Sequence, residues 1–412
     1  MTLDSLWGWR GNSDTGMTGA KRIAILTLSV GSGHVRAAEV IQRALLDGGG
    51  SIEVRTLDAI ELARPWFRWV YVEPYWWMLR HAPGLWRRLF ERRQRKGHRA
   101  TAPHWVFRRG CVEALRQLQA FAPHLVIATE IGAAEIAALA KREGWLSSPV
   151  LAVQTDLQTE PPWAQREIDV YGVGSEEAKA QLIGWGVSPN RIVLCGIPID
   201  PAFALAFDES EVLRALGLDP RRPVVLVMGG GMGPAPLDEI IQSLERCGLP
   251  LQVLAVCGRD QAMKLRLESL RGKIALDLHV FGWSDNIPEL MTAADLLITK
   301  PGGVTVAEAL AVGVPMLLTH PIPGPEERHV RYLEQNGLAV RARNLEEIPQ
   351  LAHQLLSSPE KLAEMARRAR ELARPDAARA VAHIARALLE TATYIDLLAA
   401  PPARSGESAY LM

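Results

Sequence analysis

The stretch DLLITKPGGVTVAEAL, residues 295–310, decides the fold. A short apolar run ends at Lys300, Gly302 and Gly303 turn the chain, and a helical segment begins near Val304. A strand that passes through glycines into a helix is typical of parallel α/β sheets, and the free N–H groups at the start of such a helix attract anions. The stretch therefore predicts an α/β fold with a diphosphate site at this turn.

Two polar residues follow the turn. Thr305 lies near the start of the expected helix, where we count it with the donor-binding residues. Glu308 lies about one turn into the helix, where its carboxylate can accept two hydrogen bonds from a ribose diol. In a simpler interpretation, Glu308 is only an acidic residue that complements the helix dipole.

Short apolar runs alternate with segments of helical period along the whole chain, which predicts parallel sheets covered by helices. In the first half we expect strands at 22–29, 52–57, 124–129, 149–155, 170–174 and 191–195. In the second half we expect them at 223–228, 251–256, 276–281, 295–299, 314–319 and 338–340. The second half thus repeats the architecture of the first, and two prolines within residues 196–201 mark the break between them.

The length of 412 residues fits two hydrophobic cores better than one. We expect a disordered extension at 1–20, a first domain at 21–200, a second domain at 201–375, a C-terminal helix at 376–395 and a loose tail at 396–412. The Ala-, Arg- and Glu-rich stretch from 346 to 393 is expected to be helical.

Charge and cysteine content exclude several classes of protein. Lys plus Arg and Asp plus Glu are both 46, so no global field attracts nucleic acid. The cysteines lack a C-x-x-C pair, which argues against a disulfide framework or a zinc site and fits a reducing cytosol. The chain shows neither the apolar region of a secretory signal nor about 18 uninterrupted apolar residues, so we expect no membrane-spanning helix.

Two further glycine-rich turns follow the first expected strand of each half. The first contains Gly31 and Gly33 before His34, and the second contains Gly229, Gly230 and Gly231. Glycines at these positions let backbone N–H groups approach an anion or a substrate closely. The first lacks the dinucleotide-binding fingerprint, and no P-loop Gly-Lys-Ser/Thr occurs, which disfavours a nicotinamide-dependent enzyme and a kinase.

Residues 64–109 combine twelve Arg or Lys with six of the twelve tryptophans. This mixture suits lipid headgroups, where tryptophan prefers the interface and each basic residue gains about 1 kcal/mol from anionic lipids. Stacking of single-stranded nucleic acid is a competing interpretation, and a helical pair packed on the first domain is another. The residues expected to dock on the membrane are Trp66, Trp69, Trp76, Trp77, Trp86, Arg87, Arg88, Arg92 and Arg93.

Taken together, five segments between residues 21 and 390 resemble the monogalactosyldiacylglycerol synthase family and the bacterial diacylglycerol glucosyltransferases. The segments are GSGH at 31–34 with Ala37 and Ala38, TDL at 155–157, SEEAK at 175–179 with GIP at 196–198, MGGGMG at 228–233, and KPGGVTVAEAL at 300–310. The resemblance implies a GT-B fold, in which two Rossmann-like domains face each other across a cleft. It implies that the second domain holds the donor and the first holds the acceptor.

The resemblance also implies an activity, the inverting transfer of a hexose from a UDP-hexose to diacylglycerol at a membrane surface. The partners would be UDP-hexose, diacylglycerol and anionic membrane lipids, but no nucleic acid, and the location would be cytoplasmic and peripheral to the membrane. No cofactor and no tightly bound metal are expected beyond the donor. The chain agrees in having no Asp-x-Asp pair, which metal-dependent glycosyltransferases use to hold a divalent cation.

Several residue roles follow from the resemblance. Gly258, Arg259 and Phe281 would line the nucleoside pocket, and Asp156 would shape the acceptor side together with Gly31 and Gly33. The leaving-group charge would be met by the backbone around Gly302 and Gly303 and by Lys300. His34 is the expected general base, which takes the proton of the acceptor hydroxyl. In a simpler interpretation, His34 only caps the start of a helix.

The chain departs from the family at residues 322–329. Pro325 occupies the position of a glutamine that is expected to read sugar hydroxyls, so the choice between galactose and glucose stays open. Glu326 remains as a partner for the hexose, and His329 stands where the family has asparagine. Three other functions stay open, namely a transferase for a peptidoglycan precursor or another glycolipid, a non-hydrolysing sugar epimerase, and a non-catalytic peripheral membrane protein.

Overall fold

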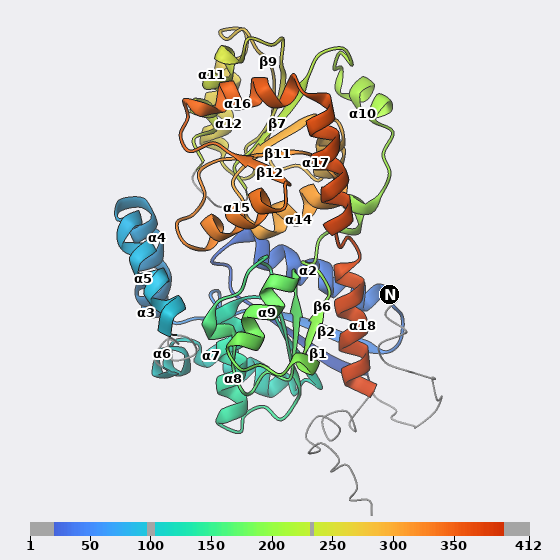
Figure 1. Cartoon of the computed structure of the whole chain (residues 1–412). Helices are drawn as coiled ribbons and strands as arrows, with labels where there is room; N and C mark the ends of the chain where they lie inside the picture. Colours follow the sequence, from blue (N-terminus) through green and yellow to red (C-terminus); the bar gives the residue numbers. More distant parts are fainter. Residues whose placement is uncertain (1–19, 97–103, 231–234, 391–412) are drawn as a thin grey trace, which may run out of the picture.

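A computed structural model describes residues 20–96, 104–230 and 235–390 of the chain (Figure 1). The segments expected to be an N-terminal extension and a C-terminal tail lie outside these residues almost entirely, and so do Gly231 and residues 391–395 of the expected C-terminal helix. The described chain forms two α/β domains, one above the other in Figure 1.

The first domain is a six-stranded parallel sheet in the order β2-β1-β3-β4-β5-β6. Its strands are β1 (Lys21–Thr27), β2 (Ile52–Asp58), β3 (Leu125–Ala128), β4 (Val150–Val153), β5 (Val170–Val173) and β6 (Ile192–Leu194). The helices against this sheet include α2 (Ser32–Asp47), α7 (Val112–Phe121), α8 (Ile131–Arg142) and α9 (Glu176–Gly184). All six strands expected in the first half are confirmed.

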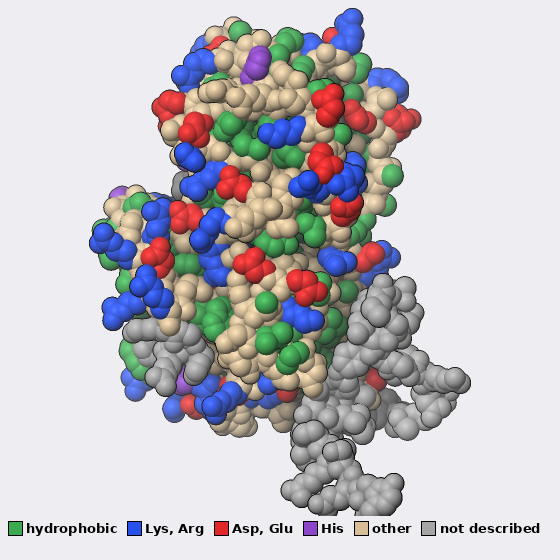
Figure 2. All heavy atoms as spheres, viewed as in Figure 1, with side chains coloured by type: hydrophobic (Ala, Val, Ile, Leu, Met, Phe, Trp, Pro, Cys, Tyr) green, Lys and Arg blue, Asp and Glu red, His purple; other side chains and the backbone are tan. Residues whose placement is uncertain are grey.

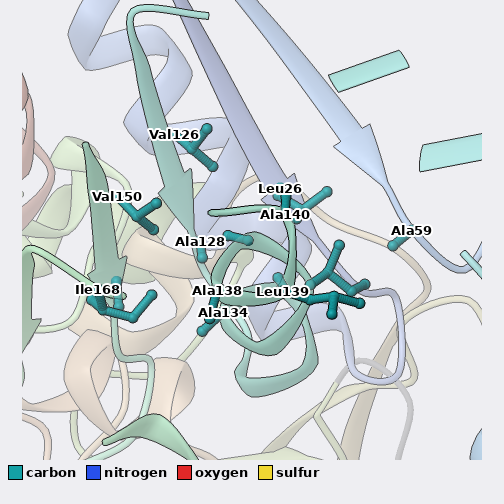
Figure 3. Close-up of a cluster of buried hydrophobic side chains, with 14 of the residues drawn as sticks. Leu26, Ala59, Val126, Ala128, Ala134, Ala138, Leu139, Ala140, Val150 and Ile168 are labelled. Carbon is teal, nitrogen blue, oxygen red and sulfur yellow. The ribbon is translucent and has the colours of Figure 1, made fainter. Parts of the chain in front are cut away.

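Both faces of this sheet are buried because its strands alternate between two cores. Ile23 and Ile25 of β1 face one core, while Ala24 and Leu26 face the other. Figure 3 shows the second of these cores, where the alanines of α8 pack close to the sheet near Leu26. Strands buried on both faces are continuously apolar, which is why they could be predicted from the sequence.

The second domain repeats this plan with a parallel sheet in the order β12-β11-β10-β7-β8-β9. Its strands are β7 (Val224–Met228), β8 (Gln252–Val256), β9 (Asp277–Phe281), β10 (Leu296–Thr299), β11 (Met316–Leu318) and β12 (Ala339–Arg341). Its helices include α10 (Glu209–Leu216), α11 (Leu237–Leu244), α12 (Gln261–Leu270), α13 (Ile287–Thr292), α14 (Gly303–Val312) and α15 (Pro325–Gln335). The six strands expected here are also confirmed.

The chain passes from the first domain to the second around residues 195–204. Ile197 and Ile199 already belong to the core of the second domain, and the short helix η5 (Pro201–Ala204) follows them. The other short helices are η3 (Pro161–Trp163), η4 (Pro189–Arg191) and η6 (Glu245–Cys247).

The helical C-terminal stretch consists of three helices, namely α16 (Glu347–Leu356), α17 (Pro359–Leu372) and α18 (Ala377–Glu390). Pro359 and Pro375 lie at the two breaks, where proline cannot continue a preceding helix. The last helix returns to the first domain and packs along α2 (Figure 1). There Val381 and Ala385 join the core of Ile23 and Ile25.

A group of helices projects from the side of the first domain and reaches the second (Figure 1). It consists of α3 (Pro65–Phe67), the π-helical turn η1 (Arg68–Val72), α4 (Glu73–His81) and α5 (Pro83–Lys96), with α6 (His104–Gly110) beside it. We call residues 65–96 the arm. Figure 2 shows Lys and Arg side chains gathered over the arm on this face of the molecule.

Candidate active site

A cavity of about 1030 Å³ is lined by residues of both domains and holds most of the expected site residues. The expected site residues that line it are Gly31, Gly33, His34, Asp156, Gly230, Gly258, Lys300, Gly302, Gly303, Thr305, Glu308 and Glu326. In each sheet the cavity lies at the point where the strand order reverses, next to β1 and β3 below and β7 and β10 above. The carboxyl ends of parallel strands at such a point are where α/β proteins bind ligands.

Helix α14 begins at the cavity without a side-chain cap. Its N-cap residue is Gly302, in extended conformation, so the first N–H groups of the helix have no side-chain acceptor. A Cβ at Gly303 would lie 2.0 Å from the carbonyl oxygen of Thr155, which means that the first domain touches the start of the helix directly. The arrangement is suited to a diphosphate held between backbone amides and the other domain.

Lys300 lies over the glycine turns and is held by a carboxylate. Its Nζ is 2.8 Å from Oε1 of Glu326, and both side chains are largely buried. Oε2 of Glu326 accepts a hydrogen bond from the N–H of Ile322. A Cβ at Gly230, where φ is +72°, would lie 2.9 Å from Cε of Lys300, so the lysine requires glycine beneath it.

Glu308 points from α14 into the cavity and is half-buried. Burial raises the pKa of Glu308 to about 8, Arg36 opposes this shift, and the carboxylate of Asp200 adds to it. Arg36 comes from α2 of the first domain, where its Nη2 lies 3.7 Å from Asp200. Glu308 therefore sits where a hydroxyl-bearing ligand could exchange hydrogen bonds with a neutral or an ionised carboxyl group.

His34 lies in the first turn of α2, after the Gly31 turn. Its Nδ1 is 2.8 Å from the hydroxyl of Thr155, and among the residues that the structure describes no hydrogen bond is made by its Nε2. The Thr155 hydroxyl can accept from Nδ1–H, which leaves the lone pair of Nε2 for a ligand in the cavity.

Sequence reasoning missed Glu130, which also lines the cavity. Its carboxylate caps α8 by accepting from the N–H groups of Gly132 and Ala133, at 2.6 and 3.2 Å. Burial raises the pKa of Glu130, while the nearby His34 and the hydrogen bonds from the two amides lower it. The sequence did offer a signal for Glu130, since this residue directly follows the apolar strand expected at 124–129. The ends of strands next to the point where the strand order reverses are where α/β proteins form their sites.

His329 connects the turn at residues 300–303 to the first domain. It is 1% exposed, and its Nδ1 lies 2.9 Å from the carbonyl oxygen of Pro301. Since a carbonyl only accepts, Nδ1 carries a proton. Nε2 of the same ring lies 3.6 Å from Oδ1 of Asp156 across the domain boundary.

The expected nucleoside residues are only partly brought together. Gly258 lines the cavity, whereas Gly229, Arg259 and Phe281 do not. The guanidinium of Arg259 lies over the ring of Trp283, 4.6 Å from its centroid, and Trp283 itself lines the cavity. The aromatic wall at this end is therefore Trp283, which the sequence interpretation did not include.

Two family models match the two domains. The model described as monogalactosyldiacylglycerol (MGDG) synthase matches residues 34–199, and the glycosyltransferase family 28 C-terminal domain matches residues 224–381. A processive diacylglycerol beta-glucosyltransferase of Bacillus cereus is 31% identical over 365 residues, which cover 87% of this chain and 91% of that protein. One of Bacillus thuringiensis is 31% identical over 377 residues, with coverage of 90% and 93%.

The chain belongs to the monogalactosyldiacylglycerol synthase family.

Solved structures show the fold of this family member. MurG of Acinetobacter baumannii superimposes with a TM-score of 0.59 at 17% identity, over 89% of this chain and all of that one. Anabaena HepE in complex with UDP-glucose gives a TM-score of 0.51 at 15% identity, over 92% of this chain and 99% of that one. The two parallel sheets and these likenesses confirm the expected GT-B fold.

The arm of this family member has an outer and an inner side. Five of the residues expected at the membrane are exposed, namely Trp69, Trp77, Arg87, Arg88 and Arg92, and among these Arg87 pairs with Glu327 of the second domain. Trp69 is 73% exposed and Trp77 is 57% exposed. These two tryptophans are free to meet another surface.

The other residues of that set, and Arg87 with them, have partners inside the protein. Trp66 packs against the first core, Trp76 lines the cavity, and Arg93 lines it while pairing with Glu160. Trp86 and Arg87 contact the second domain. The sequence cannot separate the two groups, because both have the same composition and spacing.

Within residues 20–96, 104–230 and 235–390, no group of three or more His, Cys, Asp or Glu side chains is placed to hold a metal ion. In the same ranges no helix is both long and apolar enough to cross a bilayer.

Proposed function

We propose that this protein transfers a hexose from a UDP-sugar to diacylglycerol at a membrane surface. The observation that carries the proposal is that the uncapped start of α14, Glu308 and His34 open into one cavity from opposite domains. A diphosphate, a ribose diol and an acceptor hydroxyl are the groups that these three features suit. The names of the relatives, diacylglycerol glucosyltransferases, supply the acceptor class.

On the donor side, the free amides of α14 hold the diphosphate, and Lys300 meets part of its charge. Because Lys300 is already paired with Glu326, the two side chains form a polar unit that faces the donor together. Glu308 binds the ribose hydroxyls, and Trp283 covers the nucleobase. These groups stabilise the UDP leaving group as its bond to the sugar breaks.

On the acceptor side, Nε2 of His34 takes the proton of the attacking hydroxyl. Thr155 fixes the ring orientation, and the buried carboxyl group of Glu130 stabilises the imidazolium that forms. The hydroxyl oxygen attacks the anomeric carbon on the face opposite to UDP, so the configuration of that carbon inverts.

The lipid reaches His34 along the arm. Tyr71, Tyr75 and Trp76 line the cavity on this side, and Val70 both lines the cavity and is 54% exposed. Trp69, the neighbour of Val70 in the chain, is exposed on the outside of the arm. An aromatic path that ends in exposed tryptophans and basic side chains fits an enzyme that docks peripherally on anionic lipids, with no nucleic acid partner.

Product analysis by mass spectrometry tests the proposal. The protein is incubated with anionic vesicles containing diacylglycerol and with UDP-glucose, UDP-galactose or UDP-N-acetylglucosamine. We expect a hexosyl diacylglycerol, with UDP-glucose as the first donor to examine because the relatives are named glucosyltransferases. No product from any donor, although UDP binds, would instead support another lipid acceptor or a non-catalytic membrane protein.

A further inference from the structure

Helix α5 of the arm holds a loop of the other domain. The indole Nε1 of Trp86 donates to the carbonyl oxygen of Pro323 at 2.9 Å. The guanidinium of Arg87 donates to both carboxylate oxygens of Glu327, with Nε 3.1 Å from Oε2. The loop, residues 322–327, is separated from these partners by well over 200 positions in the sequence.

A third contact depends on a glycine. Gly324 has φ +90° and ψ −90°, and a Cβ there would lie 2.7 Å from Cγ of Phe90. Phe90 is 3% exposed, so its ring packs against bare backbone at the start of α15. Only glycine allows both this backbone conformation and this approach.

The same loop carries a donor-site residue. Glu326 lies between the contacts of Gly324 and Glu327, and it holds Lys300 at 2.8 Å. The N–H of Ile322 donates to Glu326, and the N–H of Gly324 donates to Glu327. The geometry of Glu326 thus depends on a short loop that α5 grips from outside.

We propose that Trp86, Arg87 and Phe90 are positioning residues of the donor site. They order the loop at 322–327 from the opposite domain, and they thereby keep Glu326 against Lys300. This inference rests on the proposed function only in taking Lys300 and Glu326 as donor-binding, since the contacts themselves do not depend on the reaction.

Arg87 and its neighbour Arg88 provide a matched pair of variants. Arg88 is exposed and makes no ion pair within the described part of the chain, whereas Arg87 pairs with Glu327. Arg87→Gln and Arg88→Gln remove the same charge from adjacent positions. If both arginines only attract lipid, the two variants behave alike.

Hydrogen–deuterium exchange is the first measurement, and it requires no sugar transfer. In Arg87→Gln and in Trp86→Phe, we expect the amides of Ile322 and Gly324 to exchange roughly three- to tenfold faster than in the parent protein, because a hydrogen-bonded contact is lost. Arg88→Gln should exchange as the parent does. Equal protection of this loop in the Arg87 and Arg88 variants would overturn the proposal.

Donor kinetics are the second measurement. For Arg87→Gln we expect KM for the UDP-sugar to rise roughly fivefold, with kcat within about twofold and vesicle binding unchanged, because ordering the loop then opposes donor binding. Arg87→Lys should recover part of the loss. High salt should raise the parent's KM toward that of Arg87→Gln and leave Arg88→Gln indistinguishable from the parent.

The two readouts separate failure of the inference from failure of the proposed function. Should no UDP-sugar be used, calorimetric binding of UDP replaces KM, and the exchange result stands alone. Faster exchange with unchanged UDP-sugar affinity would show that the loop is held by α5 but does not position the donor, which also overturns the proposal.

Discussion

The carboxyl group of Glu308 lowers the folding stability of the protein at high pH, although the same group is proposed to bind the donor. Its pKa of about 8 in the folded protein lies above the ordinary value of 4.5, so it keeps its proton on folding between these pH values. The unfolded chain loses that proton from about pH 4.5 upward, and the folded protein is therefore destabilised progressively as pH rises toward 8. Above that value the full penalty is present.

Glu308→Gln should remove this penalty. We expect the variant to unfold a few degrees higher than the parent at pH 8.5 and at the same temperature at pH 4.5, measured by thermal scanning. If Glu308 binds the ribose as proposed, UDP affinity should fall at least tenfold, because an amide cannot accept from both ribose hydroxyls as a carboxylate does. Unchanged stability at both pH values, with unchanged UDP binding, would contradict the assigned environment.

His34 is the residue whose loss should affect chemistry alone. His34→Ala should lower kcat by roughly 10²- to 10⁴-fold, as loss of a general base does, with calorimetric UDP affinity within about twofold. Thr155→Val keeps the side-chain size but removes the hydroxyl at Nδ1, and a smaller loss, about tenfold, is expected. Full turnover in His34→Ala would remove this residue from the mechanism.

At the scale of elements, the strands of the described residues could be predicted, whereas the contacts of the arm could not. Strands such as β4 and β10 are buried along their whole length and so appear as uninterrupted apolar runs. Different side chains of the arm contact three different surfaces, namely the core of the first domain, the cavity and the second domain. Composition alone does not reveal which side chain meets which surface.

The contact between α14 and the β4–β5 connection makes a prediction about Gly303. An alanine is tolerated at a helix start, but its Cβ would overlap the carbonyl of Thr155 and approach Asp156. Gly303→Ala should therefore push the domains apart here and raise the UDP-sugar KM at least tenfold.

Gly184→Ala is the control for this substitution, because a Cβ there meets no atom within 4 Å. We expect it to retain the parent KM. Equal KM values for the two variants would mean that the contact at Gly303 has no bearing on the donor site.

At the scale of the whole molecule, the exposed tryptophans of the arm predict vesicle binding. Trp69→Ala combined with Trp77→Ala should reduce partition onto phosphatidylglycerol vesicles roughly tenfold, measured by co-sedimentation, without changing thermal stability. Leu265→Ala removes an equally exposed apolar side chain from α12 and should have no effect. Unaltered partition of the tryptophan variant would refute docking through this face.

The candidate site was predictable where chemistry follows a strand end. Lys300, Glu308 and His34 come directly after buried strands or in the helix that follows, so their place at the cavity follows from topology. Trp86 and Arg87 were assigned to the membrane because nothing in sequence distinguishes them from Trp77 and Arg88. Their real partners lie in another domain, and only tertiary structure brings these together.

The return of α18 to the first domain has a consequence for how the protein matures. The apolar face formed by Ile23 and Ile25 is completed by Val381 and Ala385, which are synthesised after the strands of both sheets. The first domain thus cannot finish folding before the second has been synthesised, although its own sheet ends at β6. A fragment that ends at residue 375 would expose a hydrophobic surface along α2. We therefore expect it to aggregate rather than to remain folded in solution.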